Sequence, residues 1–107
     1  MNIRTNDETR FPAAENALKM VIDPEIGMNI IDLGLVYDIF FNDEKKTIMV
    51  RMTLTTEFCP MGESITQNTE QVLKDTFPEF SISVVLTFDP PWNPEKISEA
   101  GKEFLTM

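Results

Sequence analysis

Alternating apolar and polar residues predict three β-strands along this chain. They cover residues 35–41, 47–55 and 80–88, and the polar residues 42–46 connect the first two at hairpin length. The third strand alternates most cleanly, and its residues expected to face inward are Phe80, Ile82, Val84, Leu86 and Phe88. Each strand is expected to bury one face against helices.

Apolar residues at helical spacing predict three helices around these strands. The first begins at Pro12 and ends before Asp23-Pro24, because a proline disfavours helical geometry in the residue before it. Its apolar face consists of Ala14, Ala17, Leu18, Val21 and Ile22. The second helix covers about residues 60–77, and the third opens at Asn93-Pro94.

The order of elements, α-β-β-α-β-α, predicts a small α+β two-layer sandwich with helices packed against a three-stranded sheet. A strand–helix–strand unit is right-handed in nearly all proteins, so the third strand should run parallel to the second. The pattern does not say which strand it lies beside. Residues 1–11 lack periodicity and are predicted as a flexible N-terminal leader, with residues 12–107 as a single domain.

The segment 25–34 is too apolar to be a solvated linker, so it is expected to pack against the rest of the fold. Long packed loops are more often functional than short ones. Its apolar part, residues 26–33, is therefore a candidate docking face, and the acidic surface of the chain is another.

The charge balance narrows the choice of partners. The 107 residues include 18 acidic and 9 basic side chains, a formal net charge of −9. Such a surface repels phosphate backbones and anionic lipids, so neither nucleic acid nor a membrane is expected as a partner. No apolar run approaches the roughly 20 residues that span a bilayer, and residues 1–10 lack a signal-peptide core. A cytoplasmic location is expected.

Cysteine and histidine counts narrow the chemistry. The chain has one cysteine, Cys59, and no histidine. It therefore has no intramolecular disulfide, no structural zinc site of its own and no imidazole base, and it is not expected to be an enzyme.

Cys59 stands where the second strand ends and the middle helix begins, at the expected N-cap before Pro60. The helix dipole favours a thiolate there, whereas the nearby charges of Glu57 and Glu63 oppose it. Two interpretations remain open on position alone: a metal-binding or reactive thiol, and a small buried apolar side chain.

Each other candidate also has a structural interpretation. Asp23 stops a helix, Asp32 forms a turn and Glu25 is a solvated loop charge. Thr53 and Thr55 lead into the middle helix. Trp92 is expected to be a packing anchor beside Pro90-Pro91.

Four motifs occur in a fixed order along the chain. They are Asp23-Pro24-Glu25-Ile26-Gly27, Ile30-Ile31-Asp32-Leu33-Gly34-Leu35-Val36-Tyr37, Met52-Thr53-Leu54-Thr55 with Cys59-Pro60-Met61, and Asp89-Pro90-Pro91-Trp92. Together they resemble the small metal–sulfur cluster assembly proteins of the SufT and PaaD type, which also form the N-terminal domain of some Mrp-like ATPases. The resemblance covers about residues 13–105. The SufT-like branch fits better, because the chain lacks a C-terminal cysteine-rich extension.

The resemblance implies an accessory role in iron–sulfur cluster assembly or transfer, with Cys59 as metal ligand. It carries the family's signature acids onto Asp23, Glu25 and Asp32, and its threonines onto Thr53 and Thr55. One departure is that Glu57-Phe58 stands where family members commonly carry Pro-Gly.

One thiolate does not enclose a cluster, since clusters usually take four protein ligands. A transient cluster is therefore expected, with further ligands from Glu57, a small thiol, a facing Cys59 in a homodimer, or a partner. The partners expected are an assembly scaffold or client apoproteins. The alternative is a metal-free adaptor that docks such proteins, and a thiol enzyme ranks last because no base is present.

Overall fold

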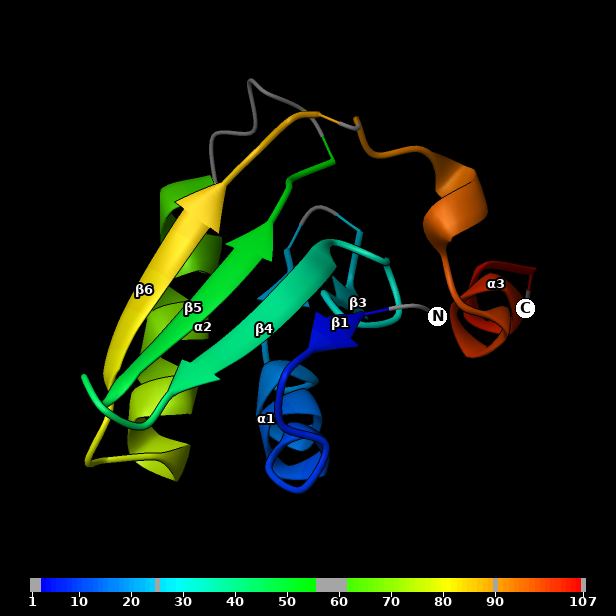
Figure 1. The fold of residues 1–107 in the computed structure, drawn as a ribbon. Helices are drawn as coiled ribbons and strands as arrows, with labels where there is room; N and C mark the ends of the chain where they lie inside the picture. Colours follow the sequence, from blue (N-terminus) through cyan, green and yellow to red (C-terminus); the bar gives the residue numbers. More distant parts are fainter. Residues whose placement is uncertain (1–2, 25, 56–61, 90, 107) are drawn as a thin grey trace.

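A four-stranded sheet with helices on one side organises the described part of the chain (Figure 1). The computed structural model describes residues 3–24, 26–55, 62–89 and 91–106. The elements are β1 (Arg4–Thr5), α1 (Phe11–Leu18), β2 (Ile22–Asp23), β3 (Met28–Asn29), β4 (Val36–Asn42), β5 (Thr47–Met52), α2 (Gly62–Thr76), β6 (Ser81–Leu86), the 3₁₀ turn η1 (Pro94–Lys96) and α3 (Glu99–Thr106).

The strand order β1-β4-β5-β6 answers the question that the sequence left open. β4 pairs with β5 in antiparallel fashion, and β6 runs parallel to β5 and lies beside it. The expected parallel orientation is confirmed, as is the α+β arrangement. The predicted sheet of three strands is wrong in its count, because β1 adds a fourth strand and β2 pairs with β3 in a second, two-stranded sheet.

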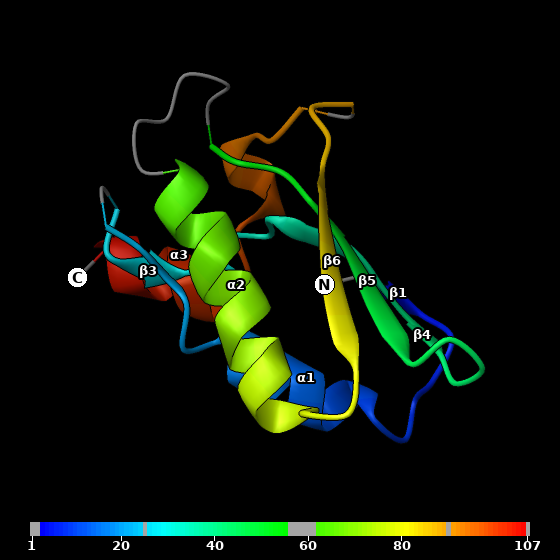
Figure 2. The same ribbon diagram turned by 90° about the vertical axis from the view of Figure 1, so that its left-hand side faces the viewer.

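The core lies between the sheet and the helices α1 and α2, which Figure 2 shows on one side of the sheet. Alternate residues of β5 point into it, as the pattern predicts, and their side chains are fully buried. From α1 and α2 the core receives apolar side chains that lie on one face of each helix, spaced by whole helical turns. The buried residues from these elements include Ile48, Val50, Met52, Ala14, Leu18, Ile65 and Leu73.

The first helix is shorter than predicted. It ends at Leu18, because Met20 and Val21 bond back three residues, to the carbonyls of Ala17 and Leu18, and tighten the last turn. Ile22 then enters β2. Its 46% exposure shows that it is not part of an apolar helix face.

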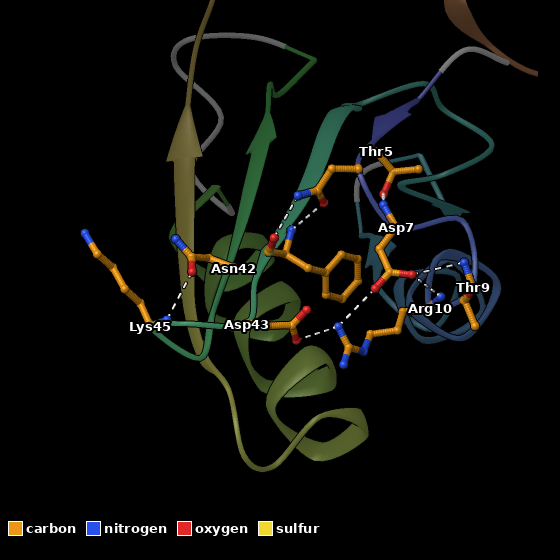
Figure 3. A network of polar contacts seen from close by, with 9 residues as sticks. Thr5, Asp7, Thr9, Arg10, Asn42, Asp43 and Lys45 are labelled. Atoms are coloured by element: carbon orange, nitrogen blue, oxygen red, sulfur yellow. Dashed lines mark hydrogen bonds and ion pairs between the residues drawn. The ribbon is translucent and has the colours of Figure 1, made fainter.

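Residues 3–11 belong to the fold, whereas the sequence predicts a flexible leader over 1–11. β1 pairs with β4, and Asn6 exchanges two hydrogen bonds with the backbone of Phe41 (2.7 and 2.8 Å). Figure 3 shows Arg10 between the carboxylates of Asp7 and Asp43, at 2.9 and 2.8 Å. The pattern of apolar residues did not reveal this segment, because it is attached to the sheet mainly by polar side chains and by a strand of only two residues.

A β-bulge changes the predicted faces of β4. The register shifts between Val36 and Asp38, so Tyr37 is an extra residue opposite β5. The bulge interrupts the simple alternation along β4, so that Val36 is buried and Tyr37 is half-buried.

The C-terminal segment is also divided, since η1 and α3 replace the single predicted helix. It runs along the loop between β3 and β4. Trp92 is partly buried against the hydrophobic core, and its indole donates a hydrogen bond to the Leu33 carbonyl (2.6 Å).

Candidate functional site

Two of the predicted site residues lie just beyond the carboxyl end of β5. Thr53 is fully buried, and its N–H donates to the Leu35 carbonyl at 2.8 Å, which extends the pairing of β5 past its last strand residue. Thr55 is half-buried and ends the described segment.

The start of α2 is held close to this strand end. Gly62 packs so tightly on Leu54 that a Cβ added to the glycine would lie 2.6 Å from Leu54 Cδ1. Residues 56–61 connect these two ends. Cys59 and Glu57 belong to this connection and, like Glu25, lie outside the described residues.

Asp23 is a fully buried acid in β2. Its backbone carbonyl accepts hydrogen bonds from the N–H groups of Ile26 (3.2 Å) and Gly27 (2.7 Å), which form a tight turn after the strand. Aspartates are rarely fully buried, since removing a carboxylate from water is costly. Its burial distinguishes Asp23 from an ordinary surface helix stop.

Asp32 joins two parts of the fold. Its carboxylate oxygens accept hydrogen bonds from Asn29 Nδ2 (2.8 Å) and Ser98 Oγ (2.9 Å), and its backbone carbonyl accepts one from Ser98 N–H (2.7 Å). These bonds tie the loop before β4 to the residue that precedes α3. The structure therefore gives Asp32 a structural role.

In the described ranges, no group of three or more Asp, Glu, Cys or His side chains is arranged to hold a metal ion. Asp23 and Asp32 thus do not form such a group together with a third described acid. The helices of the described ranges also include none that is both long and apolar enough to cross a membrane.

Most apolar side chains of the segment proposed from sequence as a docking face are buried instead. Met28, Ile30, Ile31 and Leu33 are each at most 4% exposed and belong to the hydrophobic core. The expectation that this segment packs is confirmed. It does not present these apolar side chains to a partner.

A cavity of about 440 Å³ beside the same loop was not anticipated. On one wall, the Lys96 ammonium lies 4.5 Å from the centre of the Tyr37 ring and donates to its hydroxyl at 3.2 Å. Glu95 and Glu99 also line the cavity, so its charge is mixed. Lys96 and Tyr37 are 59 residues apart, and no sequence pattern connects them.

A buried carboxylate with two arginine partners lies on the side of the sheet away from α1 and α2. Asp38 is buried and accepts hydrogen bonds from Arg4 of β1 (2.7 Å) and from Arg51 of β5. Burial raises the pKa of Asp38, but the hydrogen bonds and positive charges of the two arginines outweigh it and lower that pKa overall. The same contact raises the pKa of Arg4.

Comparison with known proteins identifies the family. The family described as iron–sulfur cluster assembly protein matches residues 13–86. This chain belongs to that family. The match includes the connection between β5 and α2 that contains Cys59.

Named relatives agree with this assignment. The chain is 42% identical over 84 residues to the Fe-S protein maturation auxiliary factor SufT of Staphylococcus aureus (strain USA300), covering 78% of this chain and 93% of that protein. It is 36% identical over 86 residues to the Fe-S protein maturation auxiliary factor YitW of Bacillus subtilis (strain 168), covering 80% and 83%.

A solved structure shares the fold. It is a domain of unknown function from Bacillus anthracis, with a TM-score of 0.84 and 35% identity, covering 90% of this chain and 91% of that one.

Proposed function

We propose that this chain is an accessory factor in the maturation of iron–sulfur proteins and that Cys59 contacts the iron or the cluster. One observation carries the proposal: the single thiol of the chain lies inside the family match, in the connection between β5 and α2. The relatives named as maturation auxiliary factors support the accessory role. A cytoplasmic location is part of the same proposal.

Cluster chemistry limits what one chain does alone. Iron–sulfur clusters usually take four thiolate ligands, and this chain supplies one. The cluster is therefore cargo, held transiently between Cys59 and ligands from a client apoprotein, a scaffold or a second copy. Incomplete ligation from one chain favours release, which suits transfer better than storage.

The supporting residues are proposed from their places in the fold. Asp23 contributes a buried carboxylate, and Thr53 and Thr55 follow β5 where the chain leads into the Cys59 connection. Glu25, two residues after Asp23, and Glu57, two residues before Cys59, are proposed as further carboxylates of the site. Asp32 is assigned to docking the C-terminal segment, because its oxygens already accept hydrogen bonds.

Anaerobic reconstitution with iron and sulfide tests the role of Cys59. Wild-type protein should bind about half a cluster per chain, as expected for a cluster shared between two chains, and Cys59→Ser should bind none. Visible absorption and iron per chain are the readouts. Ser98→Ala serves as the control, because it removes a hydrogen bond to Asp32 and leaves the thiol unchanged.

The metal-free adaptor is the alternative that this experiment separates. If wild-type and Cys59→Ser protein both fail to retain iron, and Cys59→Ser still supports maturation of a client enzyme, the adaptor function replaces the proposal. The chain would then act by binding assembly or client proteins alone.

A further inference from the structure

We infer that the outer edge of β6 binds an extended segment of another protein by strand addition, and that this segment carries basic residues at its ends. The two edge strands of the sheet differ in how well they are protected against pairing with another strand. β1 is a two-residue edge strand that includes Arg4, whereas β6 has six residues with no charged residue and no proline. Short length, charge and proline are the usual protections of a sheet edge, and β6 has none of them.

Figure 2 shows β6 as the strand nearest the viewer, with no described element across its outer side. It pairs with β5 alone among the described strands. Its outward backbone groups are therefore available for pairing within the described fold.

Two hydrogen bonds identify which amides point outward. Ser81 N–H donates to the Lys46 carbonyl (2.8 Å), and Thr87 N–H donates to the Met52 carbonyl (2.9 Å). In a parallel pair, alternate residues of a strand bond to the same neighbour, so the odd-numbered residues between them also face β5. The N–H and C=O groups of Ile82, Val84 and Leu86 then point to the free edge.

Exposed apolar side chains lie at the carboxyl end of this edge. Val85 and Leu86 are each 42% exposed, although Leu86 was predicted to face inward. Leu86 remains exposed because an edge strand has a neighbour on one side only. An added strand would cover both side chains through cross-strand contacts.

Charge determines which kind of segment fits best. Glu79 precedes β6 in the chain and Asp89 follows it, and both are exposed. The helix α2 packs beside β6 and exposes three more acids, Glu63, Glu70 and Asp75. The ammonium of Lys74 is engaged by the carbonyls of Pro78 and Phe80.

A second copy is disfavoured by the same charges. Antiparallel pairing of two β6 strands centred on Val84 would bring Glu79 opposite Asp89 of the other copy, and each copy carries a net charge of −9. Lysines or arginines at the ends of a partner segment would instead face these acids.

A synthetic peptide tests the inference on the whole chain. The probe has five alternating valines and threonines with two lysines at each end. Amide hydrogen exchange followed by NMR should show protection of Ile82, Val84 and Leu86 on peptide addition, with little change at Ser83 and Val85. The same peptide with glutamates at its ends should bind at least about 10-fold more weakly.

Two variants separate the backbone contact from the side chain. Leu86→Pro removes an outward N–H without removing a bond to β5, and it should abolish peptide binding. Leu86→Ala keeps the N–H and should bind within about threefold of wild type. If Leu86→Pro fails to fold, the wild-type protein is tested with a peptide that is N-methylated at the amides facing β6. This peptide should not bind, because it lacks the N–H donors that pair with the strand.

Three results would overturn the inference. They are no protection of the outward amides, equal binding of the lysine-ended and glutamate-ended peptides, and protection that rises with protein concentration before peptide is added, which identifies a second copy as the occupant. Strand addition does not need the thiol, so Cys59→Ser should bind the peptide as wild type does. A failed reconstitution and a failed peptide titration are therefore separate outcomes.

Discussion

At the scale of single residues, Asp38 shows how tertiary structure changes the meaning of a charge. From sequence alone, Asp38 is a polar residue within the predicted strand over residues 35–41. In the fold it lies opposite Arg4 on one neighbouring strand and Arg51 on the other. A buried carboxylate is tolerated there because two guanidinium groups donate to it.

Asp38→Asn should lower the free energy of unfolding by roughly 2 kcal/mol at pH 7, because it weakens charge-assisted hydrogen bonds to both arginines. The cost stays moderate since Arg4 is largely exposed and regains water. Urea unfolding measures it. Asp43→Asn is the control: Asp43 pairs with Arg10 at the surface, so its loss should cost less than about 0.5 kcal/mol.

The same residue predicts a pH dependence. The pKa of Asp38 is lowered from 3.8 in the folded protein, so its contribution is complete above the unfolded-state pKa and is lost as pH falls through the folded-state pKa. Between about pH 5 and pH 2, wild-type stability should therefore fall more steeply than that of Asp38→Asn. Parallel curves for the two proteins would contradict this assignment.

At the scale of elements, the loop between β3 and β4 and the C-terminal segment hold each other in place. Trp92, Lys96 and Ser98 contact the loop at Leu33, Gly34 and Asp32. Gly34 has φ +77°, and a Cβ there would lie 2.2 Å from the Lys96 carbonyl oxygen. A glycine is needed at this position both for its backbone conformation and for the close approach.

Gly34→Ala should therefore destabilise the fold by roughly 2–4 kcal/mol and displace the C-terminal segment. The fluorescence of Trp92, the single tryptophan, should shift to longer wavelength as its indole is released. Gly27→Ala is a matched control: Gly27 has φ +81°, but nothing lies within 4 Å of the added Cβ. It should cost only the roughly 1–2 kcal/mol of left-handed backbone, with unchanged fluorescence.

At the scale of the whole molecule, the N-terminal segment completes the sheet. β1 covers the edge of β4, and Asn6, Asp7 and Arg10 fix the chain between that edge and the start of α1. The guanidinium of Arg10 also lies 5.2 Å from the centre of the Phe80 ring.

Removing residues 1–6 distinguishes a leader from a structural strand. A flexible leader predicts no change in stability, whereas loss of β1 and of the Asn6 bonds to Phe41 should cost roughly 2–4 kcal/mol. Asn6→Ala in the full chain should account for about 1 kcal/mol of that loss. Thermal and urea unfolding of the three proteins measure both values.

The parts that could be predicted depend on neighbours along the chain. The alternation in β5 and the packing of the apolar residues Ile30, Ile31 and Leu33 follow from local pattern, and the structure agrees with both. For the candidate site, the motifs placed Thr53 and Thr55 where β5 leads toward α2.

The roles that could not be predicted depend on contacts between residues far apart in the sequence. The role of Asp32 requires Ser98, which is 66 residues away, and the role of Asn6 requires Phe41, which is 35 residues away. A strand of two residues such as β1 is too short to show an alternation of apolar and polar residues.

The order of the three main strands and of α1 and α2, the lack of histidine and the motifs shared with the iron–sulfur cluster assembly family could all be read from the sequence. The fold was needed to show that β6 pairs with β5 alone among the described strands and that β1 pairs with the other side of β4. It was also needed to show which side chains bind Asp38 and Asp32. The physical reason is that local periodicity records which side of an element is buried. It does not record which distant backbone or charge the element meets.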